Sequence, residues 1–100
     1  MTLKAVILAV EGNEIVGSVI AGWDGWRWHL YRIAVRGDRR RQGIARDLIA
    51  AAEEHFAAQG ARRVDAVVLE DNTLGQAAWT ALGYVPQHAW RRWVRRLDAR

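Results

Sequence analysis

The first third of the chain alternates apolar runs with turn sequences, which is typical of β-strands. An apolar, β-branched run over residues 4–10 ends at a Glu-Gly-Asn-Glu turn, and a second run covers residues 15–21. An Asp-Gly pair between tryptophans then predicts a tight hairpin turn. A third strand over residues 28–35 follows. The pattern therefore predicts an antiparallel three-stranded meander.

Beyond residue 38 the apolar spacing becomes helical. Apolar residues recur three and four positions apart from Ile44 to Phe56, and Gly60 suits the left-handed residue that ends a helix. The run over residues 63–69 is nearly all apolar around its centre, which favours a fourth strand buried on both faces.

A second helix and a last strand complete the predicted order. Asn72 offers a helix cap, and Gly83 follows the helical segment as a stop. Residues 84–97 are predicted to form the last strand. The order β-β-β-α-β-α-β predicts an α/β fold with one mixed, mostly antiparallel sheet. At 100 residues the chain has room for one hydrophobic core, so we expect a single domain over residues 1–100.

The charge balance suggests an anionic partner. Fifteen Lys and Arg against eleven Asp and Glu give a net charge of +4, and Lys4 is the only lysine. Arginine suits bidentate phosphate contacts, so nucleic acid, an acidic surface or a phosphorylated cofactor is indicated, although codon usage alone could produce the same bias.

Several kinds of chemistry are excluded or disfavoured by the composition. The absence of cysteine excludes disulfides, thiolate zinc sites and a cysteine nucleophile. His55 and His88 have no partners at metal-ligand spacing, so no metal site is predicted. No apolar run approaches the roughly 20 residues of a membrane span, and we expect a cytoplasmic protein with no membrane contact.

The junction between the third strand and the first helix has the chemistry of a pyrophosphate site. Unpaired amides and the positive end of the helix dipole favour an anion there, and small residues let phosphate oxygens approach the backbone. Flanking arginines add charge. The candidate residues are Arg40, Arg41, Gln42, Gly43, Ile44 and Ala45.

This segment resembles the acyl-CoA-binding motif of the GNAT superfamily of N-acetyltransferases. Arg40, Gly43 and Ala45 stand on the fixed positions of that motif. Residues 69–73, Trp79 and the Leu-Gly-Tyr sequence at residues 82–84 are similar to the next strand, asparagine and helix of the superfamily. The resemblance covers residues 4–97 and implies a GNAT-like acyl-CoA N-acyltransferase fold.

The resemblance implies acetyl-CoA as the acyl donor. The backbone of Ile33, Ala34 and Val35 would pair with the pantetheine arm, and the loop named above would hold the pyrophosphate. Arg39 and Arg41 could reach cofactor phosphates, and which of them does is open. Asn72 would hydrogen-bond the pantetheine arm or its loop; these assignments are implied by the family alone.

The proton-transfer groups are less defined. Many family members carry a tyrosine acid where this chain has Trp79, and an indole cannot protonate a thiolate, so Trp79 is interpreted as a wall of the cofactor site or as core. Glu70 is the first candidate for a general base and Tyr31 the second, with His29 on the same strand. A solvated or capping carboxylate is the alternative role for Glu70.

Relative to the family, the chain begins at the second strand, so we expect an N-terminally truncated form. An exposed apolar edge would then favour a homodimer. Residues 90–97 interleave tryptophan with arginine, a pattern that could bind single-stranded nucleic acid but also fits a charged edge strand. The leading hypothesis is an acetyl-CoA-dependent N-acetyltransferase acting on a primary amine of a small molecule or peptide. The alternative is a non-catalytic CoA-binding or basic nucleic-acid-binding dimer.

Overall fold

The computed structural model describes residues 3–98, which belong to two compact units. The first unit extends to Leu69 and contains a four-stranded sheet and one long helix. The second unit begins at Glu70 and contains one short helix. The described helices include none that is long and apolar enough to cross a membrane.

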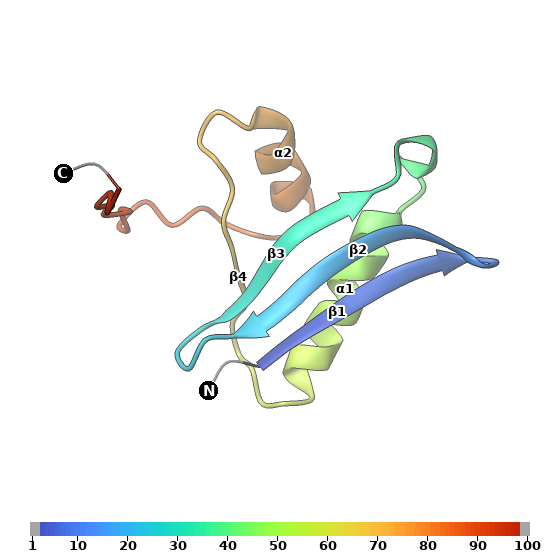
Figure 1. Cartoon of the computed structure of the whole chain (residues 1–100), viewed down its shortest axis with the longest axis horizontal. Coiled ribbons are helices and arrows are strands. Elements are labelled where there is room, and N and C mark those ends of the chain that lie inside the picture. Colours follow the sequence, from blue (N-terminus) through green and yellow to red (C-terminus); the bar gives the residue numbers. More distant parts are fainter. Residues whose placement is uncertain (1–2, 99–100) are drawn as a thin grey trace. The chain divides into compact units, whose positions relative to one another are not determined.

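The first unit is built on an antiparallel meander (Figure 1). Strands β1 (Leu3–Glu11), β2 (Glu14–Trp23) and β3 (Trp28–Val35) pair in chain order. The first turn places Gly12 at φ 61° and the second places Gly25 at φ 96°, a backbone region that favours glycine. The predicted meander is confirmed.

Helix α1 (Ile44–Ala57) supplies the other half of the core. Its apolar stripe packs on one face of the sheet, as the sequence period predicted. The two layers together bury eight apolar side chains, and the burial of each large one contributes about 1.5–3 kcal/mol to stability. They are Val16, Val19, Ala21, Leu30, Leu48, Ile49, Ala52 and Phe56.

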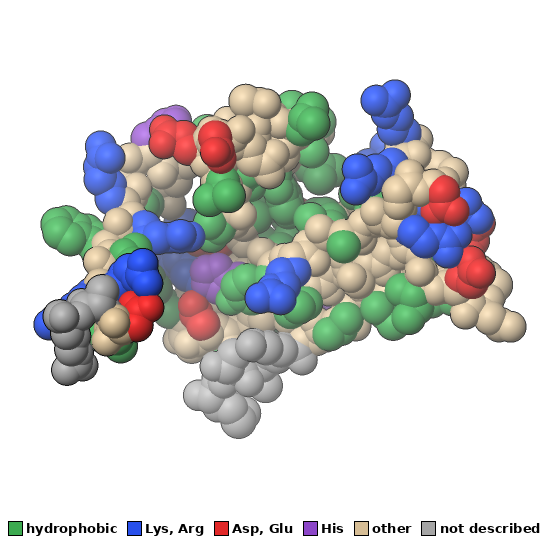
Figure 2. Space-filling model, turned by 45° about the horizontal axis from the view of Figure 1, so that its top comes forward, with side chains coloured by type: hydrophobic (Ala, Val, Ile, Leu, Met, Phe, Trp, Pro, Cys, Tyr) green, Lys and Arg blue, Asp and Glu red, His purple; other side chains and the backbone are tan. Residues whose placement is uncertain are grey.

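The opposite face of the sheet is apolar but exposed. On β1, Val6 is 63% exposed, Leu8 47% and Val10 58%. The strand register places Val6 opposite Ile20 and Val10 opposite Ile15, which is also exposed. Figure 2 shows hydrophobic side chains lying uncovered on the surface of the molecule. The α1 face therefore holds the core, while the other face is available for contact.

Of the predicted strands, the fourth is shorter than expected and the last does not form among the described residues. Strand β4 is only Asp65–Ala66 rather than residues 63–69, and Val67 and Leu69 are exposed instead of buried on both faces. The described part of residues 84–97 forms no strand. In that segment both faces would mix tryptophan or valine with arginine, so neither offers an apolar surface that could hold a strand in a sheet.

Helix α2 (Thr73–Ala81) begins as predicted at Asn72. The Asn72 side-chain oxygen accepts a hydrogen bond from the Gly75 amide at 2.9 Å. After the helix, the Tyr84 ring packs edge-on against Trp79 with ring centroids 4.7 Å apart. Tyr84 is therefore a packing residue.

The contact between β2 and α1 depends on Gly17. A Cβ built at this position would lie 3.0 Å from Ile44 Cγ2 and 3.1 Å from Leu48 Cδ1. Gly17→Ala should therefore lower the free energy of unfolding by about 1–3 kcal/mol, because α1 must shift or its side chains must leave their rotamers.

Urea denaturation measures this effect. Gly37→Ala is the matched control, because a Cβ there meets no atom within 4 Å. A Gly17→Ala midpoint equal to that of the control would contradict the close packing of α1 on β2.

Candidate functional site

Strands β3 and β4 part soon after they meet. Their parallel ladder contains the pairs His29–Asp65 and Leu30–Ala66, whereas β3 continues to Val35. From Tyr31 onward, the β3 edge that faced β4 has no strand partner among the described residues. Its main-chain donors and acceptors are therefore available to an extended ligand.

A bulge in β3 coincides with this parting. Ile20 pairs with Tyr31 and Ser18 with Ala34, so Val19 lies opposite two residues of β3. One of them, Arg32, has φ 48°, which is unusual for a residue with a side chain. A bulge bends its strand and increases the local twist. The ladder with β4 ends at Leu30, directly before the bulge.

The loop after β3 leads directly into the start of α1. A 3₁₀ turn, η1 (Gly37–Arg39), is followed by left-handed backbone at Arg41 (φ 64°) and Gly43 (φ 77°). The first helical hydrogen bond runs from the Asp47 amide to the Gly43 carbonyl at 3.0 Å. The preceding amides, at residues 44–46, have no helical acceptor, and no side chain caps this end of the helix.

The residues of this loop fit a pyrophosphate. A Cβ at Gly43 would meet only the Arg46 guanidinium within 4 Å, at 3.6 Å, so the backbone there is open to a ligand. Arg40 and Arg41 are exposed beside the amides. Unpaired amides, the positive end of the helix and two guanidinium groups form a suitable environment for an anion.

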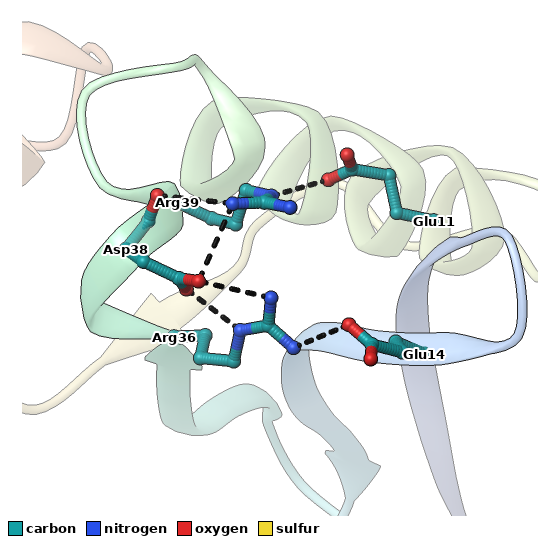
Figure 3. Close-up of polar contacts among 5 residues, drawn as sticks. All are labelled: Glu11, Glu14, Arg36, Asp38 and Arg39. Atoms are coloured by element: carbon teal, nitrogen blue, oxygen red, sulfur yellow. Dashed lines mark hydrogen bonds and ion pairs between the residues drawn. The ribbon is translucent and has the colours of Figure 1, made fainter.

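Ion pairs tie the loop to the β1–β2 hairpin (Figure 3). Arg36 contacts Asp38 at 2.6 Å and Glu14 at 2.8 Å, while Arg39 contacts Glu11 at 2.8 Å. Arg39 also lies 3.3 Å from Asp38. The Arg36 hydrogen bond lowers the pKa of Asp38, and the carboxylates of Asp38 and Glu14 raise the pKa of Arg36. We call these five residues the loop network.

The sequence analysis left open whether Arg39 or Arg41 reaches a phosphate, and the loop network distinguishes the two. The Arg39 guanidinium is half-buried against Glu11 and Asp38. The Arg41 guanidinium takes part in no such pair within the described part of the chain and is exposed. Arg41 is therefore the better placed of the two to meet a phosphate by side chain.

A second polar group lies at the other end of β3. His29 Nε2 is 2.8 Å from Asp24 Oδ2, and the His29 ring stacks on Tyr31 with centroids 5.5 Å apart. Hydrogen bonds from the Arg27 and Trp26 amides lower the pKa of Asp24 to about 2. Desolvation, with a smaller contribution from Asp24, raises the pKa of Tyr31. Tyr31 lies on the sheet face opposite α1 and is 37% exposed.

The remaining candidate residues lie in the second unit. The Glu70 side chain is exposed, and its main-chain carbonyl accepts a hydrogen bond from Gln76 at 2.6 Å. Asn72 caps α2, and Trp79 is half-buried against Tyr84. Within residues 3–98, no group of three or more His, Asp or Glu side chains is arranged to hold a metal ion.

The basic loop lies between β3 and α1 as the sequence predicted, but two features of β3 and its turn were missed. The Arg32 bulge was missed because glycine is the usual signal for left-handed backbone, and none stands there. The Asp24–His29 pair was missed because Asp24 was interpreted only as a turn residue. The spacing of an aspartate and a histidine on either side of a hairpin turn was the available signal.

Comparison with known proteins gives a consistent result. Residues 2–84 match the family model of the acetyltransferase (GNAT) family. An acetyltransferase of Pectobacterium atrosepticum is 41% identical over 66 residues, which are 66% of this chain and 47% of that protein. The chain thus spans about half the length of this curated relative.

Solved structures share the fold. The aminoglycoside acetyltransferase AAC(6')-Iy, in complex with a bisubstrate analogue that contains CoA, superposes with a TM-score of 0.83 at 24% identity. The match covers 93% of this chain and 69% of that one. An aminoglycoside acetyltransferase from an uncultured soil sample gives a TM-score of 0.73 at 26% identity, covering 90% and 64% of the two chains.

The predicted GNAT-like fold is thereby confirmed. The family model spans the strands, the loop with its positive-φ residues and both helices. The chain belongs to the acetyltransferase (GNAT) family.

Proposed function

We propose that residues 1–100 act as one acetyltransferase domain that moves an acetyl group from acetyl-CoA to a primary amine of a small molecule or peptide. The observation that carries this proposal is the continuity of the β3 edge with the phosphate-compatible loop. An unpaired strand edge suits the amides of a pantetheine arm, and the helix start suits a pyrophosphate. Membership of the family supplies the reaction type.

In this proposal the cofactor lies along β3 and the loop. The main chain of Ile33, Ala34 and Val35 pairs with the pantetheine arm. The pyrophosphate is held by main-chain amides of the loop, those of Arg40, Arg41, Gln42, Gly43, Ile44 and Ala45. In the second unit, Asn72 and Trp79 are the residues that the family resemblance assigns to the cofactor.

Transfer is proposed to be direct, within a ternary complex. The amine nitrogen attacks the thioester carbonyl, a new C–N bond forms, and the C–S bond breaks to release the CoA thiolate. A backbone amide near Val35 polarises the carbonyl, which is electrostatic stabilisation of the developing oxyanion. Glu70 and Tyr31, the catalytic candidates from the sequence, stay predictions as proton-transfer groups.

A neighbouring structure supports an amine acceptor. The bisubstrate analogue bound to AAC(6')-Iy joins CoA to monomethyl-acetylneamine, so that enzyme places an aminoglycoside next to the cofactor. The same reaction class is proposed for this chain, with the particular acceptor found by screening amines for thiol release.

The rival function is a non-catalytic module that binds CoA or nucleic acid. It is favoured by the exposure of Trp90 and Trp93, which are 57% and 93% exposed among arginines. Stacking on such tryptophans with arginine charge is a means of binding single strands. Acetyl-CoA binding without thiol release, or salt-sensitive nucleic-acid binding alone, would favour this rival.

We also propose that the chain forms a homodimer through the β1 side of the sheet. β1 is an edge strand with unpaired backbone groups, and its apolar side chains are uncovered. An edge strand of this kind can pair with a second copy across a two-fold axis.

The cofactor loop can be tested by calorimetric titration with acetyl-CoA. Arg40→Ala and Gly43→Glu should each weaken binding at least about three-fold, because one removes a positive charge and the other adds a carboxylate to a phosphate site. Arg62→Ala is the matched control, since Arg62 is an exposed arginine beyond the other end of α1. Equal affinities for all three variants would refute the assignment of the loop.

The loop network should preorganise the cofactor loop more than it stabilises the fold. Its side chains are largely exposed, so Asp38→Asn should change the unfolding midpoint little but reduce acetyl-CoA affinity about two-fold or more. Because Arg36 lowers the pKa of Asp38, the network should persist above the ordinary carboxylate range and be lost as the pH falls below it. An Asp38→Asn variant with unchanged acetyl-CoA affinity and a lowered unfolding midpoint would show instead that the network stabilises the fold.

Sedimentation at micromolar concentration tests the dimer. The wild-type chain should sediment above the 11.3 kDa expected of a monomer, and Leu8→Lys should return it to the monomer because a charge would be buried in the interface. A wild-type chain that sediments only as the monomer would rule the dimer out.

A further inference from the structure

In the turn between β2 and β3, both carboxylate oxygens of Asp24 take part in hydrogen bonds. Asp24 Oδ1 accepts hydrogen bonds from the Trp26 amide at 2.8 Å and the Arg27 amide at 2.7 Å. With one oxygen held by main chain, the other, Oδ2, lies 2.8 Å from His29 Nε2. The carboxylate is thus aimed at the imidazole by the backbone of its own turn.

This arrangement determines the protonation of the imidazole. Asp24 is ionised at neutral pH because its pKa is lowered to about 2, so it can only accept a hydrogen bond. His29 Nε2 must therefore carry the hydrogen and donate it. In the neutral ring the lone pair then belongs to Nδ1, and Nδ1 is the atom that can take a further proton.

The imidazole is also held in place by Tyr31. Its ring stacks against the tyrosine ring at 5.5 Å with an interplanar angle of 29°. The register places both residues on the sheet face opposite α1, where His29 pairs with Gly22 and Tyr31 with Ile20. The His29 side chain is half-buried, with 18% of its surface exposed.

The position of this pair along β3 relates it to the proposed thioester site. His29 belongs to the last two residues of β3 that pair with β4, and Tyr31 is the first residue of the opened edge. Tyr31 lies two residues before Ile33, and the bulge at Arg32 separates them. An amine over Tyr31 therefore has the imidazole on one side and the proposed pantetheine-binding segment on the other.

We propose that His29 Nδ1 accepts a proton from the ammonium of the acceptor substrate, directly or through one water, and that Asp24 is the positioning residue for His29. This inference rests on the proposed acetyl transfer. The ammonium gives one proton to His29, and the resulting amine attacks the thioester carbonyl. The second proton leaves the nitrogen for the departing thiolate, and His29 returns its proton to solvent.

The charged groups near His29 are compatible with this role. Asp24 and Arg27 come from the turn, and Tyr31 from the same strand. Asp65 is the register partner on β4, where Arg63 contacts it at 2.8 Å and Arg27 lies 3.9 Å away. Asp24 is thus the carboxylate that is hydrogen-bonded to the ring.

Two variants test the proposal. His29→Gln retains an N–H that can bond to Asp24 but has no basic nitrogen, and it should lower kcat/KM about 100-fold and abolish the acidic limb of the pH profile. Asp24→Asn keeps an oxygen for the turn amides but removes the charge. It should lower kcat and leave KM within about two-fold of the wild type, because the imidazole loses the partner that orients it.

His55→Gln is the matched control, because His55 is an exposed histidine on α1 outside the proposed site, and its pH profile should match that of the wild type. A His29→Gln enzyme with a wild-type rate and acidic limb, or an Asp24→Asn enzyme with a wild-type kcat, would overturn the assignment.

Calorimetry separates this inference from the proposed function. Both variants should bind acetyl-CoA within about two-fold of the wild type, since neither lies in the phosphate loop. A wild-type chain that binds no acetyl-CoA, or releases no thiol with any amine, would overturn the proposed function together with this role. Normal cofactor binding and wild-type turnover in His29→Gln would overturn the role of His29 alone.

Discussion

The left-handed backbone of Arg32 is the constraint on which the rest of the site depends. It lies in the bulge that sets two residues of β3 against Val19, and β3 and β4 pair over only two positions before this point. A regular strand would continue its ladder with β4, and the amides and carbonyls along that edge would be hydrogen-bonded. The bulged strand instead leaves main-chain groups unpaired beside a helix start that suits an anion.

The two ends of the opened edge are held by different means. At the loop end, ion pairs connect η1 with the β1–β2 hairpin, so the loop is anchored to the part of the sheet that packs on α1 (Figure 3). At the other end, two turn amides hold Asp24, and Asp24 holds His29. Both devices fix a functional segment with groups that do not themselves belong to the hydrophobic core.

The sequence predicted the features that depend on local pattern. The meander, both helices and the Asn72 cap follow from side-chain period and turn residues, as does the position of the basic loop before α1. The extent of β4 could not be predicted, because its apolar run looks the same whether or not a neighbour pairs with it. The Asp24–His29 bond depends on how a hairpin closes, which residue type alone does not specify. The exposure of the outer β1 face could not be predicted either, because it depends on which elements pack on the sheet and not on the sequence of β1.

The central claim is that acetyl-CoA binds along the opened edge of β3 and the start of α1, and an amide chemical-shift titration tests it most directly. Added CoA should shift the amides of Ile33, Val35, Ile44, Ala45 and Arg46 together, with one saturation curve, because the arm and the pyrophosphate belong to one ligand. Amides of the β1–β2 turn should move little. Saturable shifts confined to other segments, or no shifts at all, would contradict the account.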